Sequence, residues 1–287
     1  MNATTQLSTR IAVRPLSPAL GAEIVGVDLA KGVDDATARE IVAAWHAHSL
    51  ILLRGQTMNE DKQVAFGRHF GTVGAWSRFA DKQAGQHPNI MLVTNLKKDG
   101  KFVGSLPEGE IEFHSDGIYV ETPLKATMLY ALNIPSTGGQ TAFANMYKAY
   151  ETLPDELKAK LEGMKALHAF TYNSQKADEN EKKKSAEQTA SHAHPIFRTH
   201  PDTGRKALYV NRLMTQEIVG LPADESRRIL SLLYDHIERP EFVYEHEWRV
   251  GDVLLWDNRC LVHARRDFPA RELRLMRRLT IEGERPE

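Results

Sequence analysis

Cysteine is almost absent from this 287-residue sequence, because Cys260 is the only one. An intrachain disulfide therefore cannot form, and a zinc site built from several thiolates is excluded. Long apolar runs are missing too: segments such as residues 49–53 (SLILL) fall far short of the roughly 20 residues of a membrane-spanning helix. The N-terminus lacks a basic stretch followed by an apolar one. We expect a cytoplasmic protein in which histidines and carboxylates hold any metal.

The sequence also lacks a charge bias, with 37 Lys and Arg against 38 Asp and Glu. This balance gives the chain no general attraction for nucleic acid or anionic lipid, so recognition by charge must be local. Hydrophobic residues make up 41% of the chain, enough to bury a large core. We expect one elaborated domain over residues 1–287, although the length is equally compatible with two.

Short β-like segments dominate the chain. Apolar alternation and turn residues predict strands at 23–29, 49–53, 89–95, 111–116, 126–132, 140–144, 165–172, 207–211, 242–248, 253–257 and 273–282. Helical spacing and N-cap residues predict helices at 36–45, from 59–61 to about 70, at 155–164 and at 223–237. Many short strands with few helices are typical of a sandwich or barrel, so the fold class is mostly β with flanking helices.

Residues 173–191 form a polar, charged stretch with EKKK at its middle and almost no large apolar residue. Such a segment cannot anchor itself in a core. We interpret it as a mobile insertion. A solvated surface loop is the simpler interpretation, and a lid over an active site is the alternative.

A histidine and an aspartate two residues apart stand in the segment FHSD at 113–116. On a strand, the period of two would place His114 and Asp116 on one face, so both could bind one ion. The pair alone is weak, because such triplets arise by chance. His263, which follows the strand and turn at 251–259, is the best third candidate. Two imidazoles and one carboxylate on one side of an ion leave three coordination positions for small molecules and O2.

With these residues in view, the chain resembles the taurine dioxygenase and 2,4-dichlorophenoxyacetate dioxygenase family (TauD/TfdA). The likeness runs nearly end to end, from GAEI (21–24) through LRGQ (53–56) to the C-terminal strand. Its sharpest segments are FHSD (113–116), PSTGGQT (135–141), WDNR (256–259) leading to His263, and RLMRRLT (274–280). The resemblance implies a double-stranded β-helix, or jelly-roll, core. It also implies Fe(II) on His114, Asp116 and His263 as the catalytic centre, which uses 2-oxoglutarate and O2 and releases succinate and CO2.

The far carboxylate of 2-oxoglutarate requires a buried cation and a hydroxyl, because an unpaired carboxylate in a dry pocket is costly. Arg274 and Thr141 occupy the family's positions for that role. Without the resemblance, we would interpret Thr141 as an ordinary strand residue and Arg274 as part of a solvated arginine-rich segment. That segment holds six arginines, and a nucleic-acid patch is disfavoured because no aromatic pattern accompanies them.

The substrate is expected to be small and anionic, because Arg278 matches the family's position for gripping a sulfonate or carboxylate. On a strand, Arg274 and Arg278 would share a face about 13 Å apart and could serve different anions. Three further substrate positions align with Trp76, Phe79 and Glu110. The two aromatic residues favour an aryloxyalkanoate or a similar aromatic acid over taurine, although both could instead be core residues. We expect neither nucleic acid nor membrane as a partner, and a homo-oligomer.

Two rival functions share the same metal-binding face. One is a jelly-roll hydrolase or isomerase that uses another metal, and the other is a binding module that has lost its metal. His192, His194 and His200 suggest a second metal site, but the prolines near them favour structural turns. Cys260 is interpreted as buried packing.

Overall fold

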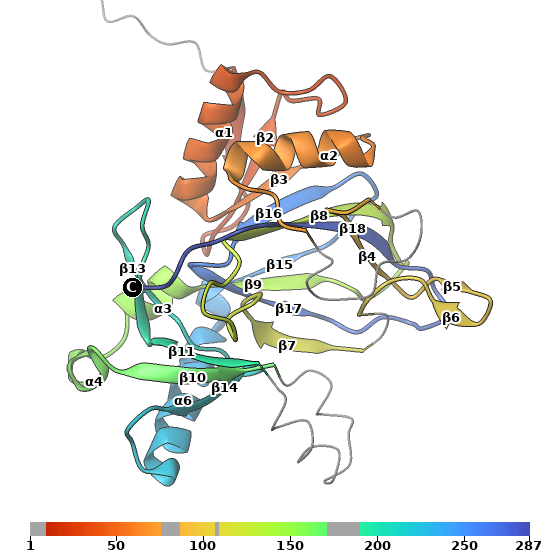
Figure 1. Ribbon diagram of the computed structural model, residues 1–287. Helices are drawn as coiled ribbons and strands as arrows, with labels where there is room; N and C mark the ends of the chain where they lie inside the picture. The colour runs from red at the N-terminus through yellow and green to blue at the C-terminus, as the bar shows by residue number, and fades with distance from the viewer. Residues whose placement is uncertain (1–9, 76–86, 107–108, 171–189) are drawn as a thin grey trace, which may run out of the picture.

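Two sheets of mostly antiparallel strands face each other in the computed structural model, which describes residues 10–75, 87–106, 109–170 and 190–287 (Figure 1). The larger sheet has the strand order β1 (Ala12–Pro15), β2 (Ala22–Val25), β3 (Leu50–Leu53), β16 (Val253–Asp257), β8 (Ala126–Asn133), β18 (Leu275–Ile281) and β4 (Met91–Thr94). The smaller sheet has the order β15 (Val243–His246), β9 (Thr141–Asn145), β17 (Leu261–Arg265) and β7 (Ile111–His114). This is the jelly-roll core predicted from the sequence.

The central strands of the larger sheet are apolar on both faces, because both faces are covered. In β3 and β16 every residue is buried. Leu52 and Leu254 point toward the smaller sheet and join the core between the sheets, which also contains Phe143. Their neighbours Leu53 and Val253 point the opposite way, into a second core. A continuous apolar run is the pattern expected of a strand buried on both sides.

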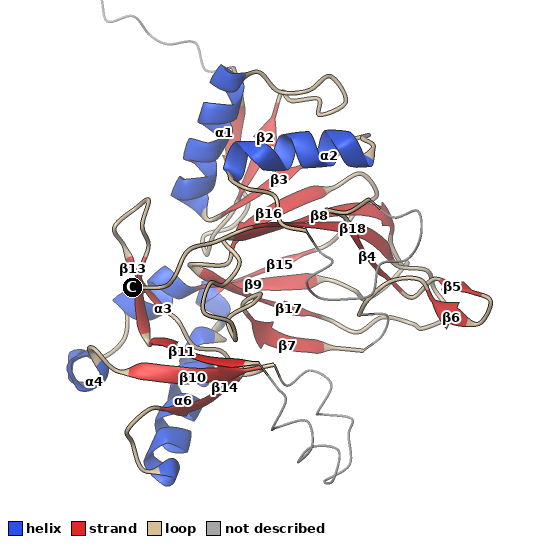
Figure 2. Ribbon diagram, in the orientation of Figure 1, coloured by secondary structure: helices blue, strands red, loops and turns tan. Residues whose placement is uncertain are grey.

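Two helices cover the outer face of the larger sheet, α1 (Asp35–His48) and α2 (Glu60–Gly67) (Figure 2). Asp34 caps α1 by accepting hydrogen bonds from the backbone of Ala36 and Thr37, and Asn59 caps α2 in the same way. Asx side chains at these positions satisfy amide groups that have no partner within the helix. Both predicted helix starts are thus confirmed within a residue or two, and α1 continues three residues beyond the predicted end.

The remaining elements lie beside the two sheets. They are β5 (Lys97–Lys98), β6 (Lys101–Phe102), α3 (Met146–Glu151), α4 (Asp155–Leu161), β10 (Lys165–Ala169), β11 (Ser191–Pro195), β12 (Phe197–Thr199), β13 (Lys206–Leu208), β14 (Thr215–Ile218) and α6 (Ala223–Ile237), with short 3-10 turns Arg68–Phe70 and Pro240–Phe242. The order β11-β10-β14 makes a third small sheet, and β12 pairs with β13. The helix predicted at 223–237 is confirmed at both ends.

The segment at 191–201 was predicted to form turns, but it contains two strands. Ser191 begins β11, which pairs with β10 along its whole length, and β12 follows. Pro195 is tolerated because it is the last residue of an edge strand, where a missing N–H costs no ladder bond. The insertion predicted at 173–191 lies outside the described residues up to 189. Among the described residues, no helix is long and apolar enough to cross a membrane.

Candidate active site

Two histidines face each other across neighbouring strands of the smaller sheet. His114 on β7 and His263 on β17 are direct cross-strand partners, and their ring centroids lie 4.1 Å apart. The Nδ1 of His114 lies 2.8 Å from the carbonyl oxygen of Glu112. A backbone carbonyl can only accept, so Nδ1 carries the proton and Nε2 presents a lone pair.

Asp116 reaches the two imidazoles from the turn after β7. The strand ends at His114, so strand alternation, which predicted a shared face, is not what brings the pair together. One carboxylate oxygen, Oδ1, lies 3.9 Å from His114 Nε2, and the other, Oδ2, lies 3.9 Å from His263 Nε2. Ligand atoms of all three residues fall within 4.8 Å of one another. The structure therefore assembles the predicted group of two imidazoles and one carboxylate.

The protonation of this group suits a divalent cation. Burial lowers the pKa of His114, and burial together with the neighbouring His114 lowers that of His263 well below its ordinary range. Burial alone would raise the pKa of Asp116, but the guanidinium of Arg278 and the two histidines hold it below its usual range. Neutral imidazoles and an ionised carboxylate are the forms that bind metals. The donor set fits Fe(II) with open positions.

A buried arginine that has no acidic partner in the described part of the chain lies beside the three ligands. Arg274 is 2% exposed, and its Nε has no hydrogen-bond partner among the described residues. Burial and the nearby Arg265 lower its pKa to about 9. A buried unpaired cation is costly unless an anion completes the site. This orphaned group is what the far carboxylate of 2-oxoglutarate would satisfy.

Thr141 lines the same cavity as Arg274. Its hydroxyl oxygen accepts a hydrogen bond from the indole Nε1 of Trp248 at 3.0 Å, which leaves the hydroxyl proton available for an anion. The turn before Thr141 is tight: a Cβ on Gly138 would lie 2.4 Å from the carbonyl oxygen of Asp267, and its φ is +75°. Glycine is required there by both its lack of a Cβ and its positive φ.

A third arginine, Arg265, enters the cavity two residues after His263 on β17. It is 5% exposed and donates to two backbone carbonyl oxygens, to Leu106 from Nη1 at 2.6 Å and to Gly109 from Nε and Nη2 at 3.2 and 2.6 Å. Leu106 has a positive φ of 53° and itself lines the cavity. Sequence reasoning assigned Arg265 no role, although alternation from His263 would have pointed it inward.

Arg278 faces the cavity from β18, four residues beyond Arg274. Its Nη2 lies 2.8 Å from Asp116 Oδ2. Among the described residues that line this cavity, three are arginines and one is a carboxylate, and the excess positive charge suits anionic ligands. The apolar part of the lining consists of Val93, Leu106, Ile111, Leu129 and Trp256.

Of the other predicted substrate residues, only Glu110 lies in the described part of the chain, and it is not brought to this group. Glu110 is exposed at the surface and forms an ion pair with Arg266 at 3.1 Å, and it is not among the residues that line the cavity. The guanidinium of Arg266 thus neutralises the Glu110 carboxylate at the surface. Trp76 and Phe79 lie outside the described residues.

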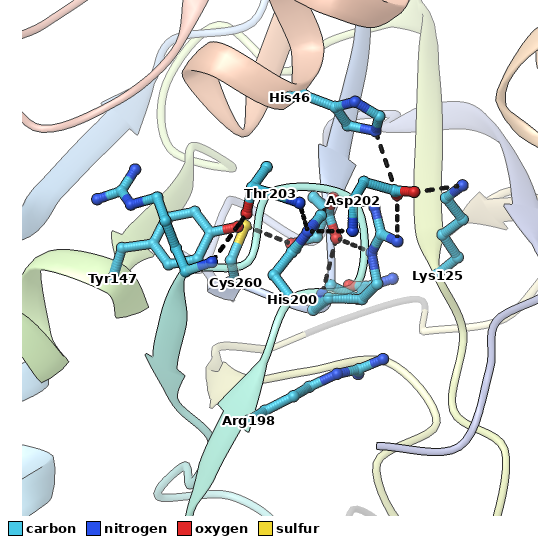
Figure 3. A network of polar contacts seen from close by, with 12 residues as sticks. His46, Lys125, Tyr147, Arg198, His200, Asp202, Thr203 and Cys260 are labelled. Atoms are coloured by element: carbon cyan, nitrogen blue, oxygen red, sulfur yellow. Dashed lines mark hydrogen bonds and ion pairs between the residues drawn. The ribbon is translucent and has the colours of Figure 1, made fainter. Parts of the chain in front are cut away.

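A second group of candidate ligands, His200, Asp257 and Cys260, is structural (Figure 3). Asp257 accepts from Arg259 Nε at 2.8 Å, from Arg259 Nη2 at 2.7 Å and from His200 Nε2 at 3.0 Å. His200 Nδ1 accepts from the backbone of Asp202 and Thr203. Burial raises the pKa of Cys260 to about 12, so its thiol stays protonated. These donors already have partners, and an adjacent guanidinium repels a cation.

His192 and His194, the other two histidines of the second metal site considered from the sequence, lie on β11 and belong to neither group of candidate ligands. The ring centroids of His192 and His194 are 4.7 Å apart, and His194 Nε2 donates to the carbonyl oxygen of Val120. The described residues thus offer no support for a metal at 192–200.

A jelly-roll whose two sheets enclose a two-histidine, one-carboxylate face, beside a buried arginine for which the described residues supply no acidic partner, defines the class of iron- and 2-oxoglutarate-dependent oxygenases. The comparisons agree: residues 12–280 match the model of the taurine catabolism dioxygenase TauD, TfdA family. The chain belongs to this family and is an Fe(II)- and 2-oxoglutarate-dependent dioxygenase. The rival hydrolase, isomerase and metal-free binding module are thereby set aside.

Known relatives are similar over almost their whole length. The (S)-phenoxypropionate/alpha-ketoglutarate-dioxygenase of Sphingobium herbicidovorans is 31% identical, with 97% of each chain covered. The alpha-ketoglutarate-dependent 2,4-dichlorophenoxyacetate dioxygenase of Cupriavidus pinatubonensis is 32% identical over 94% of this chain and 97% of its own. The structure of AAD-2 with Mn(II) and N-oxalylglycine superimposes with a TM-score of 0.78 at 30% identity, covering 96% of this chain and 98% of that one.

Proposed function

We propose that this dioxygenase hydroxylates a small organic anion, with an aryloxyalkanoate or similar aromatic carboxylate favoured and a sulfonate as the second candidate. The observation that carries the proposal is the guanidinium of Arg278 at the cavity wall, beside the candidate metal ligands. Two relatives are named for phenoxypropionate and 2,4-dichlorophenoxyacetate, which are aromatic ethers bearing a carboxylate. We expect one such acid to be a substrate.

The roles follow from the chemistry of each side chain. His114 and His263 would hold Fe(II) through neutral nitrogens and Asp116 through its carboxylate. Arg274 and Thr141 would bind the far carboxylate of 2-oxoglutarate, the guanidinium by a bidentate pair and the hydroxyl by a single donor. With O2, the bound iron and 2-oxoglutarate supply the oxidising chemistry and yield succinate and CO2.

The remaining lining keeps this chemistry dry and oriented. Val93, Leu106 and Leu129 add apolar side chains to the lining, which favours exclusion of water from the reacting atoms and strengthens the ion pairs inside the cavity. Arg278 shares its charge with Asp116, so a substrate anion that binds Arg278 is placed close to the metal ligands. Binding and positioning thereby act through one side chain.

The test is to replace Arg278 with glutamine and to use Arg277→Gln as the matched control. Arg277 lies next in sequence but donates to the carbonyl oxygen of Met58 outside the cavity. In Arg278→Gln we expect the KM for the acid to rise about 100-fold, because a charge-assisted pair is lost. Substrate-dependent succinate formation by the Arg277→Gln variant should remain near wild type.

A panel of acids identifies the substrate class. Each acid is added anaerobically to protein with Fe(II) and 2-oxoglutarate, and perturbation of the visible charge-transfer band reports binding beside the metal. Phenoxyalkanoates should perturb the band in the wild type and much less in Arg278→Gln. Metal affinity is measured in parallel, because Arg278 also contacts Asp116. Equal responses of wild type and Arg278→Gln to every acid would contradict the assignment.

A further inference from the structure

A chain of buried hydrogen bonds ends on the candidate carboxylate ligand. Trp256 Nε1 donates to Asn258 Oδ1 at 2.9 Å, and Asn258 Nδ2 donates to Thr127 Oγ1 at 3.1 Å. The hydroxyl of Thr127 then donates to Asp116 Oδ2 at 2.6 Å. Trp256, Asn258 and Thr127 are each at most 1% exposed, so water does not compete for these bonds.

The direction of this chain is fixed by its first member. An indole N–H can only donate, so the Asn258 oxygen must face Trp256 and its amide nitrogen must face Thr127. The Thr127 oxygen then accepts from Asn258 and has one proton to give, which goes to Asp116. The orientation of the Thr127 hydroxyl is thus fixed by Trp256, acting through the amide of Asn258.

Asn258 also links the segment that carries His114 and Asp116 to the residue that precedes β8. Its carbonyl oxygen accepts from the hydroxyl of Ser115, which stands between His114 and Asp116, at 2.9 Å. Its backbone N–H donates to the carbonyl oxygen of Lys125, the residue before β8, at 3.0 Å. All four polar groups of this 1% exposed side chain and backbone are therefore paired.

We propose that Thr127 and Asn258 are positioning residues that hold Asp116 for one-point coordination of the metal. Oδ2 accepts from Thr127 at 2.6 Å and lies 2.8 Å from Arg278 Nη2, so its lone pairs are engaged. Oδ1, which lies on the His114 side, is left as the donor atom for the cation. A carboxylate that binds through one oxygen keeps the remaining coordination positions available for 2-oxoglutarate and O2.

The test uses Co(II) alone, added to the full-length protein without 2-oxoglutarate, with Kd and visible absorption as readouts. Thr127→Val keeps the side-chain shape and removes the hydroxyl, and Thr127→Ser restores it. Thr280→Val is the matched control, since Thr280 is a buried threonine directly opposite Thr127 on β18 and makes none of these hydrogen bonds. The inference rests on the metal role proposed above, but not on the substrate.

Thr127→Val should weaken Co(II) binding by about 10- to 100-fold, the usual cost of losing an outer partner of a metal ligand. Its visible bands should shift as the freed Oδ2 enters the coordination sphere, while Thr127→Ser and Thr280→Val stay near wild type. Wild-type affinity and spectrum in Thr127→Val would overturn the proposal, as would equal losses in the Ser and Val variants. Thermal melts without metal show whether each variant is folded. Absence of any Co(II) binding in the wild type would instead overturn the proposed metal site itself.

Discussion

Replacing Arg274 with methionine should make the free protein more stable while removing its affinity for 2-oxoglutarate. The guanidinium is 2% exposed, and its pKa of about 9 compares with an ordinary 12.5. That difference corresponds to about 5 kcal/mol disfavouring the charged form in the fold, at 1.36 kcal/mol for each pH unit. Methionine retains much of the apolar stem and carries no charge, so we expect a gain of about 2 to 4 kcal/mol in the free energy of unfolding.

Urea unfolding at pH 7.5, followed by circular dichroism, measures this gain. The same series is repeated with Mn(II) alone and with Mn(II) plus 2-oxoglutarate. Adding 2-oxoglutarate should further stabilise the Mn(II)-loaded wild type and leave Mn(II)-loaded Arg274→Met unchanged, because the ligand's far carboxylate has lost its partner. Arg277→Met serves as control, since Arg277 lies outside the cavity. The reasoning is refuted if Arg274→Met is less stable than the wild type without ligand, or if 2-oxoglutarate stabilises it as strongly.

Two further predictions concern residues that are not themselves metal ligands. Arg265→Met should raise the Kd for 2-oxoglutarate by about 10-fold and leave Co(II) affinity unchanged, because the carbonyls of Leu106 and Gly109 lose their hydrogen-bond donors. Calorimetry in the presence of Mn(II) measures the Kd for 2-oxoglutarate. An unchanged Kd would contradict this prediction. Burial lowers the pKa of His168 to about 3 and of His194 to about 4, so both stay neutral in the fold, and stability is complete above about pH 6.5 and falls as pH drops below it. At pH 5 each of these two histidines should lower the free energy of unfolding by about 2 kcal/mol. Between pH 7.5 and 5.0, urea unfolding should therefore show a smaller loss of stability in His168→Gln than in the wild type.

Local pattern was enough to predict most strands and the capped helices. Apolar runs such as β16 and the Asx caps at Asp34 and Asn59 depend on neighbours within a few residues, so they can be predicted from the sequence. β17 was not predicted as a strand, although it carries His263. It follows a polar turn closely, and its own polar residues face the cavity, so it lacks the apolar alternation that marks a strand.

The candidate site was predicted unevenly for the same reason. His114, Asp116 and His263 were grouped because imidazole and carboxylate chemistry restricts what can share an ion, and the structure brings them together. Glu110 was placed by alignment of a loop, and it instead pairs with Arg266 at the surface. Its position illustrates that spacing along a loop carries little information on which way a side chain points.

The sequence by itself determined the chemistry available to this protein: its single cysteine, its balanced charge and its histidines and carboxylates allowed few metal centres. Only the tertiary structure decided which groups share a cavity, and it added Arg265, Thr127 and Asn258 to the site. Their roles depend on hydrogen bonds between strands that are distant in the chain, as between Thr127 and Asn258. Such bonds are set by the register in which strands pair, and register is a property of the folded sheet that no short stretch of residues encodes.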